Sequence, residues 1–183
     1  MSERIDWDAR IPLSSIQPVP REGRAWRLHR RRYAATDHGG SLSVSGRYHR
    51  ASDQFAEGET WAALYLALSA EVALGEIIRN VSPALLAQMN DYRLSELNVE
   101  LEAVLDCRDA TALLLKPDDL IRDHDFAITQ EIAAAAIGQG AEGILVPSAT
   151  RLGDNLVVFP TQLRATSRLE VISSRDPRLF VSR

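Results

Sequence analysis

Five polar side chains stand in stretches of the sequence that are otherwise apolar or rich in glycine. They are Arg27, Arg47, Tyr65, Glu76 and Ser148. Each of them alone is more often structural than functional. As a set of strand-end and loop-edge groups, a cation, a carboxylate and hydroxyls are typical of a small-molecule site. The sequence must therefore supply elements that bring these five residues together.

The segment around Glu76 predicts a helix with one carboxylate near its inward face. Ser69 is a residue type favoured at an N-cap, and Glu71 in the first turn suits the helix dipole. Glu76 follows Val72 by four residues and Ala73 by three, which places it on or beside the apolar stripe. A carboxylate there needs polar partners or has its pKa raised. Glu76 is therefore either an edge residue that reaches solvent or a group that faces a pocket.

Alternating and continuous apolar runs predict the other elements, and no internal repeat is present. Residues 1–20 read as an arm, and residues 21–183 as a single domain. Strands and helices alternate loosely, so the fold class is α+β, or mixed α/β. Strands are predicted over residues 25–33, 61–67, 94–106, 143–147, 155–159 and 169–172, and helices from Ser69, from Pro83, over 109–116 and over 126–137.

Composition narrows the class of protein. The formal net charge is −4, and 45% of the residues are hydrophobic, which is ordinary for a globular domain. No apolar run has the length of a membrane span, and the N-terminus has no signal-peptide core. The single cysteine, Cys107, excludes an internal disulfide and fits a packing thiol in a reducing, cytoplasmic environment.

Several chemistries find no support in the sequence. The histidines are scattered and form no close ligand pair with each other or with the cysteine, so we predict no metal. No GxGxxG, Walker or GxSxG motif occurs. The basic stretch HRRRY at residues 29–33 is weak support for nucleic-acid binding in an acidic chain, and a solvated or partner-facing strand is the better interpretation.

The order of the polar residues carries a resemblance to a known family. Arg27, GRYH around Arg47, YLALSAEVALGEIIR, GILVPSA and then NLVVF resemble, in this order, the RES domain, the toxin of RES–Xre toxin–antitoxin pairs. The resemblance spans about residues 24–160. It implies a fold similar to ADP-ribosyltransferases, with a central split β-sheet flanked by helices. The chain departs from the family pattern after Arg47, where Tyr48-His49 replaces the common Trp-Asn.

The resemblance also implies the residues of the site. Arg47, Glu76 and Ser148 match the arginine, glutamate and serine of the family name, and are the predicted catalytic residues. Arg27 and Tyr65 match further polar positions of the pocket, and Asn155 opens the matching strand. The predicted NAD-binding residues are Arg27, Arg47, Tyr65, Ser148 and Asn155.

The function that the resemblance implies is NAD degradation by cleavage of the nicotinamide–ribose bond, with water or phosphate as the acceptor. NAD would be a substrate, with no prosthetic group and no metal. The alternatives are a protein ADP-ribosyltransferase toxin and an inactive partner-binding module. The expected partner is a cognate Xre-like antitoxin that occludes the pocket. Neither a membrane nor direct nucleic-acid binding is expected.

Overall fold

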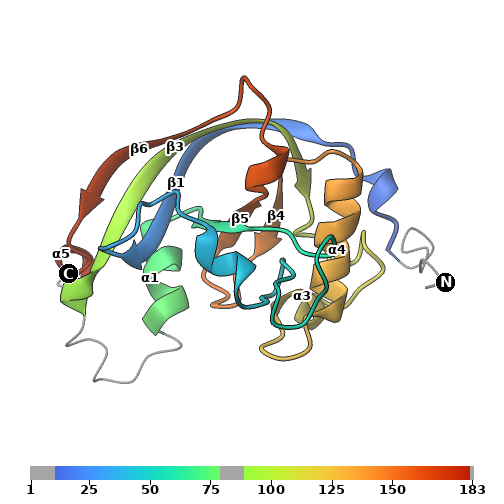
Figure 1. Cartoon of the computed structure of the whole chain (residues 1–183), viewed down its shortest axis with the longest axis horizontal. Coiled ribbons are helices and arrows are strands. Elements are labelled where there is room, and N and C mark those ends of the chain that lie inside the picture. Colours follow the sequence, from blue (N-terminus) through green and yellow to red (C-terminus); the bar gives the residue numbers. More distant parts are fainter. Residues whose placement is uncertain (1–10, 79–88, 182–183) are drawn as a thin grey trace.

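A six-stranded sheet forms the centre of the molecule in the computed structural model, which describes residues 11–78 and 89–181 (Figure 1). The strand order is β1-β2-β5-β4-β3-β6, and β1 pairs with β3 as well. Among the strands of the described residues, only the pairing of β3 with β4 is parallel. The strands are β1 (Val19–Arg30), β2 (Leu64–Ala67), β3 (Tyr92–Asp106), β4 (Gly143–Pro147), β5 (Asp154–Val158) and β6 (Arg168–Arg175).

The pairings of β1 and β3 explain why the sheet is both closed and split. β1 runs antiparallel along one edge of β3, from the pair Val19–Val104 to the pair Arg30–Tyr92, and also meets β2, so five strands form a closed circuit. On its other edge β3 pairs with β6 over residues 94–100 and with β4 over residues 104–106. The sheet therefore splits on this edge of β3, between residues 100 and 104.

Helices cover opposite ends of the sheet (Figure 1). α1 (Ala70–Ile78) follows β2 directly, and the Ser69 hydroxyl accepts a hydrogen bond from the Val72 N–H at 3.2 Å, as its predicted N-cap role requires. α3 (Pro117–Ile121) and α4 (Ala127–Gly138) lie together at the other end, and α5 (Arg178–Val181) follows β6. Gly140, with φ of 74°, lies just beyond the end of α4, which confirms the predicted stop.

Three groups of buried side chains hold these elements together. Below α4, Ile132 packs with Leu105 of β3 and Val157 of β5. A second group lies between the sheet strands, and a third joins α1 to Leu94 of β3 and to Trp26 of β1. β4 is buried except at Pro147, and β5 is buried over residues 156–158, which fits the apolar sequences of these segments.

The clearest differences from the sequence prediction are at the start of β1 and in the segment before α3. β1 begins at Val19, six residues earlier than predicted, and Leu13 in the predicted arm is fully buried against the α4 group. The predicted helix over residues 109–116 is wrong, because residues 110–114 form turns and the helix starts at Pro117. Proline lacks an N–H and is favoured in the first helical turn, so it opens this helix instead of ending one. The helix predicted from Pro83 lies mostly outside the described residues.

Within the described ranges, no helix has the length and apolar character needed to cross a bilayer.

Candidate active site

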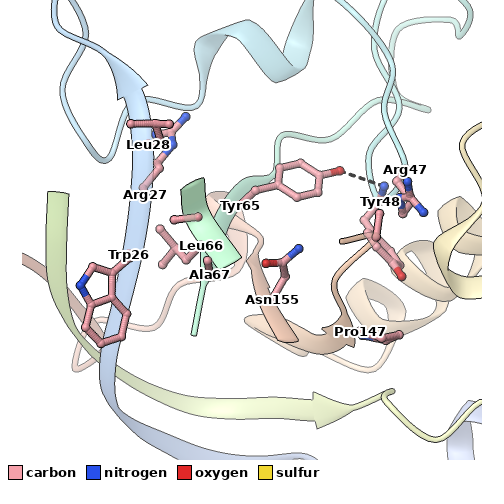
Figure 2. A pocket seen from close by; sticks show the side chains of 12 residues that line it. Trp26, Arg27, Leu28, Arg47, Tyr48, Tyr65, Leu66, Ala67, Pro147 and Asn155 are labelled. Atoms are coloured by element: carbon pink, nitrogen blue, oxygen red, sulfur yellow. Dashed lines mark hydrogen bonds between the residues drawn. The ribbon is translucent and has the colours of Figure 1, made fainter. Parts of the chain in front are cut away.

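A cavity of about 300 Å³ lies where β1, β2, α1 and the β4–β5 turn meet the loop that holds Arg47 (Figure 2). Its walls come from segments far apart in the sequence. Four of the predicted site residues line it, namely Arg27, Arg47, Tyr65 and Asn155. The other lining residues are Trp26, Leu28, Tyr48, Leu66, Ala67, Ala73, Pro147 and Ala149.

Arg27 is anchored on β1 by backbone carbonyls. Its Nη1 donates to the carbonyl oxygens of Ala35 at 2.7 Å and Asp37 at 2.5 Å. Burial lowers the pKa of Arg27, and the nearby Asp37 carboxylate opposes that shift. Since an arginine side chain starts from a pKa far above neutrality, it stays cationic here. The cavity therefore has one fixed positive charge on its β1 side.

Arg47 supplies a second cation from the opposite side of the cavity (Figure 2). Its Nη1 donates to the carbonyl oxygen of Leu120 at 3.3 Å, and its Cζ lies 5.5 Å from the centroid of the Phe126 ring. Its Nη2 lies 3.9 Å from Asp123 Oδ1, which is a loose ion pair. A carbonyl of α3 and an aromatic ring at the start of α4 thus hold the guanidinium, an arrangement suited to a planar fork.

The loop that carries Arg47 is itself held from α4. Gly46 and His49 form an isolated antiparallel bridge, in which the Gly46 N–H donates to the His49 carbonyl at 3.2 Å. The buried Gln130 amide donates to the carbonyls of Gly46 at 3.0 Å and His49 at 3.3 Å. These bonds fix the two backbone positions that flank Arg47 and Tyr48.

Tyr65 crosses the cavity from β2 toward this loop (Figure 2). Its hydroxyl oxygen accepts a hydrogen bond from the Tyr48 N–H at 2.9 Å and lies 2.9 Å from His49 Nδ1. The Tyr48 side chain is buried, and its hydroxyl donates to the Leu120 carbonyl at 3.2 Å. The Tyr65 ring is therefore presented to the cavity, because its base lies in β2 and its hydroxyl is bonded to the loop.

Asn155 and Ser148 lie near each other in the chain but differ in position. Asn155 lies in β5, opposite Ala67 of β2 and Val146 of β4, and lines the cavity. Ser148 is fully buried and does not line this cavity, although its two neighbours do. Its Oγ lies 2.7 Å from the Thr150 Oγ1 and accepts from the Thr150 N–H at 3.1 Å. Its predicted role stays a prediction.

Glu76 lies in α1, and its side chain lies outside the described part of the structure. Its backbone position is three residues beyond Ala73, which lines the cavity, so both positions share one face of the helix. The helix itself is set against the β4–β5 turn, because an added Cβ at Gly153 would lie 2.9 Å from Val72 Cγ2. The catalytic role of Glu76 stays a prediction.

Two other chemistries can be placed against the structure. Cys107 is buried, and burial raises the pKa of its thiol to about 12, so it is a packing residue, as predicted, and not a nucleophile. Among residues 11–78 and 89–181, no group of three His, Cys, Asp or Glu side chains could hold a metal ion.

A second hollow, of about 530 Å³, adjoins the cavity and shares Arg27 and Leu28 with it. Arg30, Tyr33 and Tyr92 are among the residues that line it. For the basic stretch at residues 29–33, the sequence favours a solvated or partner-facing strand and does not predict this hollow. The mixture of arginine with tyrosine in HRRRY was the available signal, because aromatic and cationic groups together suit a nucleotide.

Comparison with known proteins identifies the family of the chain and a similar solved structure. The family model described as the RES domain matches residues 24–181. The chain is also similar to a chain in the crystal structure of the M. tuberculosis MbcT–MbcA toxin–antitoxin complex, with 26% sequence identity, a TM-score of 0.77 and 92% of each chain covered. Comparison with curated protein sequences gave no match.

Proposed function

Because the chain belongs to the RES domain family, we propose that it is the toxin of a toxin–antitoxin pair and degrades NAD by cleaving the nicotinamide–ribose bond. The observation that carries the proposal is the convergence of Arg27, Arg47, Tyr65 and Asn155 on one cavity. The similarity to a chain of the MbcT–MbcA complex supports the toxin assignment.

The size and charge of the site suit a dinucleotide. A cavity of about 300 Å³ is at the lower limit for a small-molecule site, so it accommodates one half of NAD. The adjoining hollow of about 530 Å³ begins at Arg27 and receives the other half. The pyrophosphate that joins the two halves then lies beside the Arg27 cation, with Arg47 facing the nicotinamide half.

Cleavage breaks the bond between ribose C1′ and the pyridinium nitrogen. The bonding electron pair leaves with nicotinamide, which becomes neutral, and the ribose passes through an oxocarbenium-like state. The Tyr65 ring stacks on the nicotinamide, and the Asn155 amide binds a polar group of the same half. Glu76 acts beside the ribose, where a carboxylate holds the hydroxyls and stabilises the developing positive charge.

The acceptor completes the reaction. Water adds its oxygen to C1′ and releases a proton to solvent, which gives free ADP-ribose. Inorganic phosphate uses the same position and gives a phosphorylated product. Cavity geometry alone favours neither, so the product decides between them.

The partner in this proposal is an Xre-like antitoxin that covers the mouth of the cavity. A toxin that consumes NAD has to be held inactive until it is released. An antitoxin bound there would keep NAD from the cavity and from the adjoining hollow at once, because the two share Arg27 and Leu28. The purified antitoxin should stop NAD cleavage at a stoichiometric ratio.

The direct test is incubation of the purified protein with NAD, without a divalent metal, followed by chromatography. We expect nicotinamide and either free ADP-ribose or its phosphorylated form. If the NAD carries a label in its ADP-ribose part, a label that stays on protein would reassign the chain as a protein ADP-ribosyltransferase. No loss of NAD from the folded protein, freed of any partner, would contradict the proposal.

A further inference from the structure

His49 is buried beside the cavity, and its hydrogen bonds fix which ring nitrogen carries the hydrogen. Nε2 lies 2.8 Å from the Val44 carbonyl oxygen, and Nδ1 lies 2.9 Å from the Tyr65 hydroxyl. A carbonyl oxygen only accepts hydrogen bonds, so Nε2 must be the donor. In the neutral ring Nδ1 is then an acceptor, and the Tyr65 O–H donates to it.

From this geometry we propose that His49 is a positioning residue, which accepts a hydrogen bond from the Tyr65 hydroxyl and thereby holds the Tyr65 ring in place for the ligand. His49 itself does not line the cavity, so it acts through Tyr65. The inference rests on the proposed function only in naming the nicotinamide half of NAD as that ligand.

The bonds around the Tyr65 oxygen give the ring one orientation. The oxygen accepts from the Tyr48 N–H and donates to His49 Nδ1, and these partners lie in one short loop. The His49 and Tyr65 rings also meet edge to face, with centroids 5.7 Å apart and planes at 69°. With its hydroxyl hydrogen committed to His49, Tyr65 meets the ligand through its ring and not as a hydrogen-bond donor.

The surroundings of His49 keep its ring neutral and in position. Burial lowers the pKa of His49, against the opposing effects of the Val44 carbonyl and Asp53, so the acceptor at Nδ1 is retained at neutral pH. The loop leaves no spare room, because a Cβ added at Gly46 would lie 2.3 Å from His49 Cε1. Gln130 holds the His49 backbone from α4.

The experiment is a double-mutant cycle on NAD cleavage, with His49→Phe, Tyr65→Phe and the double variant. His49→Phe keeps a ring but removes the acceptor, and we expect kcat/KM to fall about tenfold, the scale of one hydrogen bond. In the Tyr65→Phe background the same change should cost no more than about twofold, because no hydroxyl remains to be oriented. His49→Asn, whose Oδ1 lies near the place of Nδ1, should recover most of the activity.

Two outcomes would overturn the inference. One is an equal fall from His49→Phe in both backgrounds, which would mean that the histidine only supports the fold. The other is a His49→Asn protein as slow as His49→Phe at equal thermal stability, since the acceptor would then be irrelevant.

Nitrogen NMR of the His49 ring gives a readout that does not need activity or a folded variant at position 49. We expect the Nε2-protonated tautomer in the wild type and a shift of the Nδ1 resonance in Tyr65→Phe. An Nδ1-protonated ring, or an unchanged Nδ1 resonance, would overturn the inference. Inactivity of the wild type toward NAD would instead refute the proposed function, and the nitrogen shifts would still decide the hydrogen bond.

Discussion

The two cavity arginines are held in different ways, which gives them different tolerance to substitution. Arg27 is tied to two carbonyls through one nitrogen, whereas Arg47 rests on the Phe126 ring and one carbonyl. The flat face and fork of Arg47 are lost in lysine even though the charge is kept.

We therefore expect Arg47→Lys to lower kcat/KM for NAD by about 10- to 100-fold, equivalent to about 1.5–3 kcal/mol for a bond to a charged group. Steady-state kinetics measures the loss. Arg168→Lys, on the exposed start of β6, is the matched control and should keep wild-type kinetics. Equal losses in both variants would show that the loss does not come from a specific contact of Arg47 with the nicotinamide half of NAD.

Glu76→Gln separates charge from shape at the proposed catalytic position. If the carboxylate stabilises a cationic transition state, turnover should fall by about 10²–10³ while NAD binding changes little. Thermal stability should hold or rise, since an amide costs less to bury than a carboxylate. Kinetics and calorimetry on the two proteins measure this. A stable and fully active variant would refute the role of Glu76, and an unfolded one would make the residue structural.

Site residues were predictable from the sequence where a polar side chain stands in an apolar or glycine-flanked stretch. Arg27, Arg47 and Tyr65 stand out as polar groups in apolar or glycine-flanked stretches, and all three line the cavity. Ser148 stands out equally, yet its hydroxyl turns toward Thr150 in the β4–β5 turn. The sequence marks His49 only as part of the departure from the family pattern, because the role proposed for it depends on a bond to Tyr65, sixteen positions away. The direction in which a loop side chain points depends on tertiary packing, and residue types and their spacing in the sequence do not determine it.

At the scale of elements, one carboxylate holds the sheet where it splits. Glu142 is fully buried, and its Oε2 accepts from the N–H groups of Glu102 at 2.6 Å and Ala103 at 3.0 Å, while Oε1 accepts from the Arg164 N–H at 2.7 Å. Residues 102 and 103 lie between the stretches of β3 that pair with β6 and with β4. A bulge there leaves two neighbouring N–H groups on one edge, and Glu142 satisfies both.

Glu142→Gln should lower the free energy of unfolding by about 1.5–3 kcal/mol, because the amide presents a donor where N–H groups require an acceptor. Urea unfolding at neutral pH measures the difference. Glu170→Gln, on the exposed part of β6, is the control and should change little. Equal stability of the wild type and Glu142→Gln would contradict the role of the carboxylate in the split.

The pH dependence of the same bonds has a definite sign. Burial acts to raise the pKa of Glu142, but the N–H groups of Arg164, Glu102 and Ala103 outweigh it, so the folded-state pKa is lowered. The stabilisation is therefore complete above the unfolded-state pKa, about 4.3, and is lost as the pH falls through the lower folded-state value. We expect the stability gap between wild type and Glu142→Gln to narrow near pH 3, measured by urea unfolding. A gap that widens on acidification would contradict this.

The types of most elements followed from the hydrophobic period, but the helix predicted over residues 109–116 and several element ends did not. The alternation in β3 and the alanine-rich run of α4 predicted both correctly. Pro117 was misjudged, since the same residue that breaks a helix interior is favoured in the first turn. The closed circuit of strands depends on pairing between β1 and β3, more than 60 residues apart in sequence, and local patterns carry no information on such pairing.

At the scale of the whole molecule, the fold redistributes the charges that the sequence keeps in separate blocks. Residues 21–50 are rich in arginine and residues 91–131 are rich in acids, and parts of these two stretches lie side by side because β1 pairs with β3. Arg24, for example, lies 3.8 Å from Glu96. Acidic side chains of β3 thus compensate part of the positive charge of β1 within the sheet. Arg30, at the end of β1, instead lines the hollow beside the cavity, where its Cζ lies 5.7 Å from the centroid of the Tyr92 ring.

This arrangement predicts that the two halves of NAD are recognised by separable surfaces. In the proposed binding mode the scissile bond lies in the smaller cavity, while Tyr33 in the hollow is half-exposed and suited to stack on adenine. Tyr33→Ala should raise KM for NAD by about 5- to 100-fold, the range for one base on an aromatic ring, with little effect on kcat. Nicotinamide mononucleotide has the same scissile bond but no adenylate, so its kcat/KM should be the same in wild type and variant. Parallel kinetics with both substrates measures this. An equal loss for both would mean that Tyr33 supports the Arg27 side of the cavity instead of binding adenylate, and no loss for NAD would place the adenylate outside the hollow.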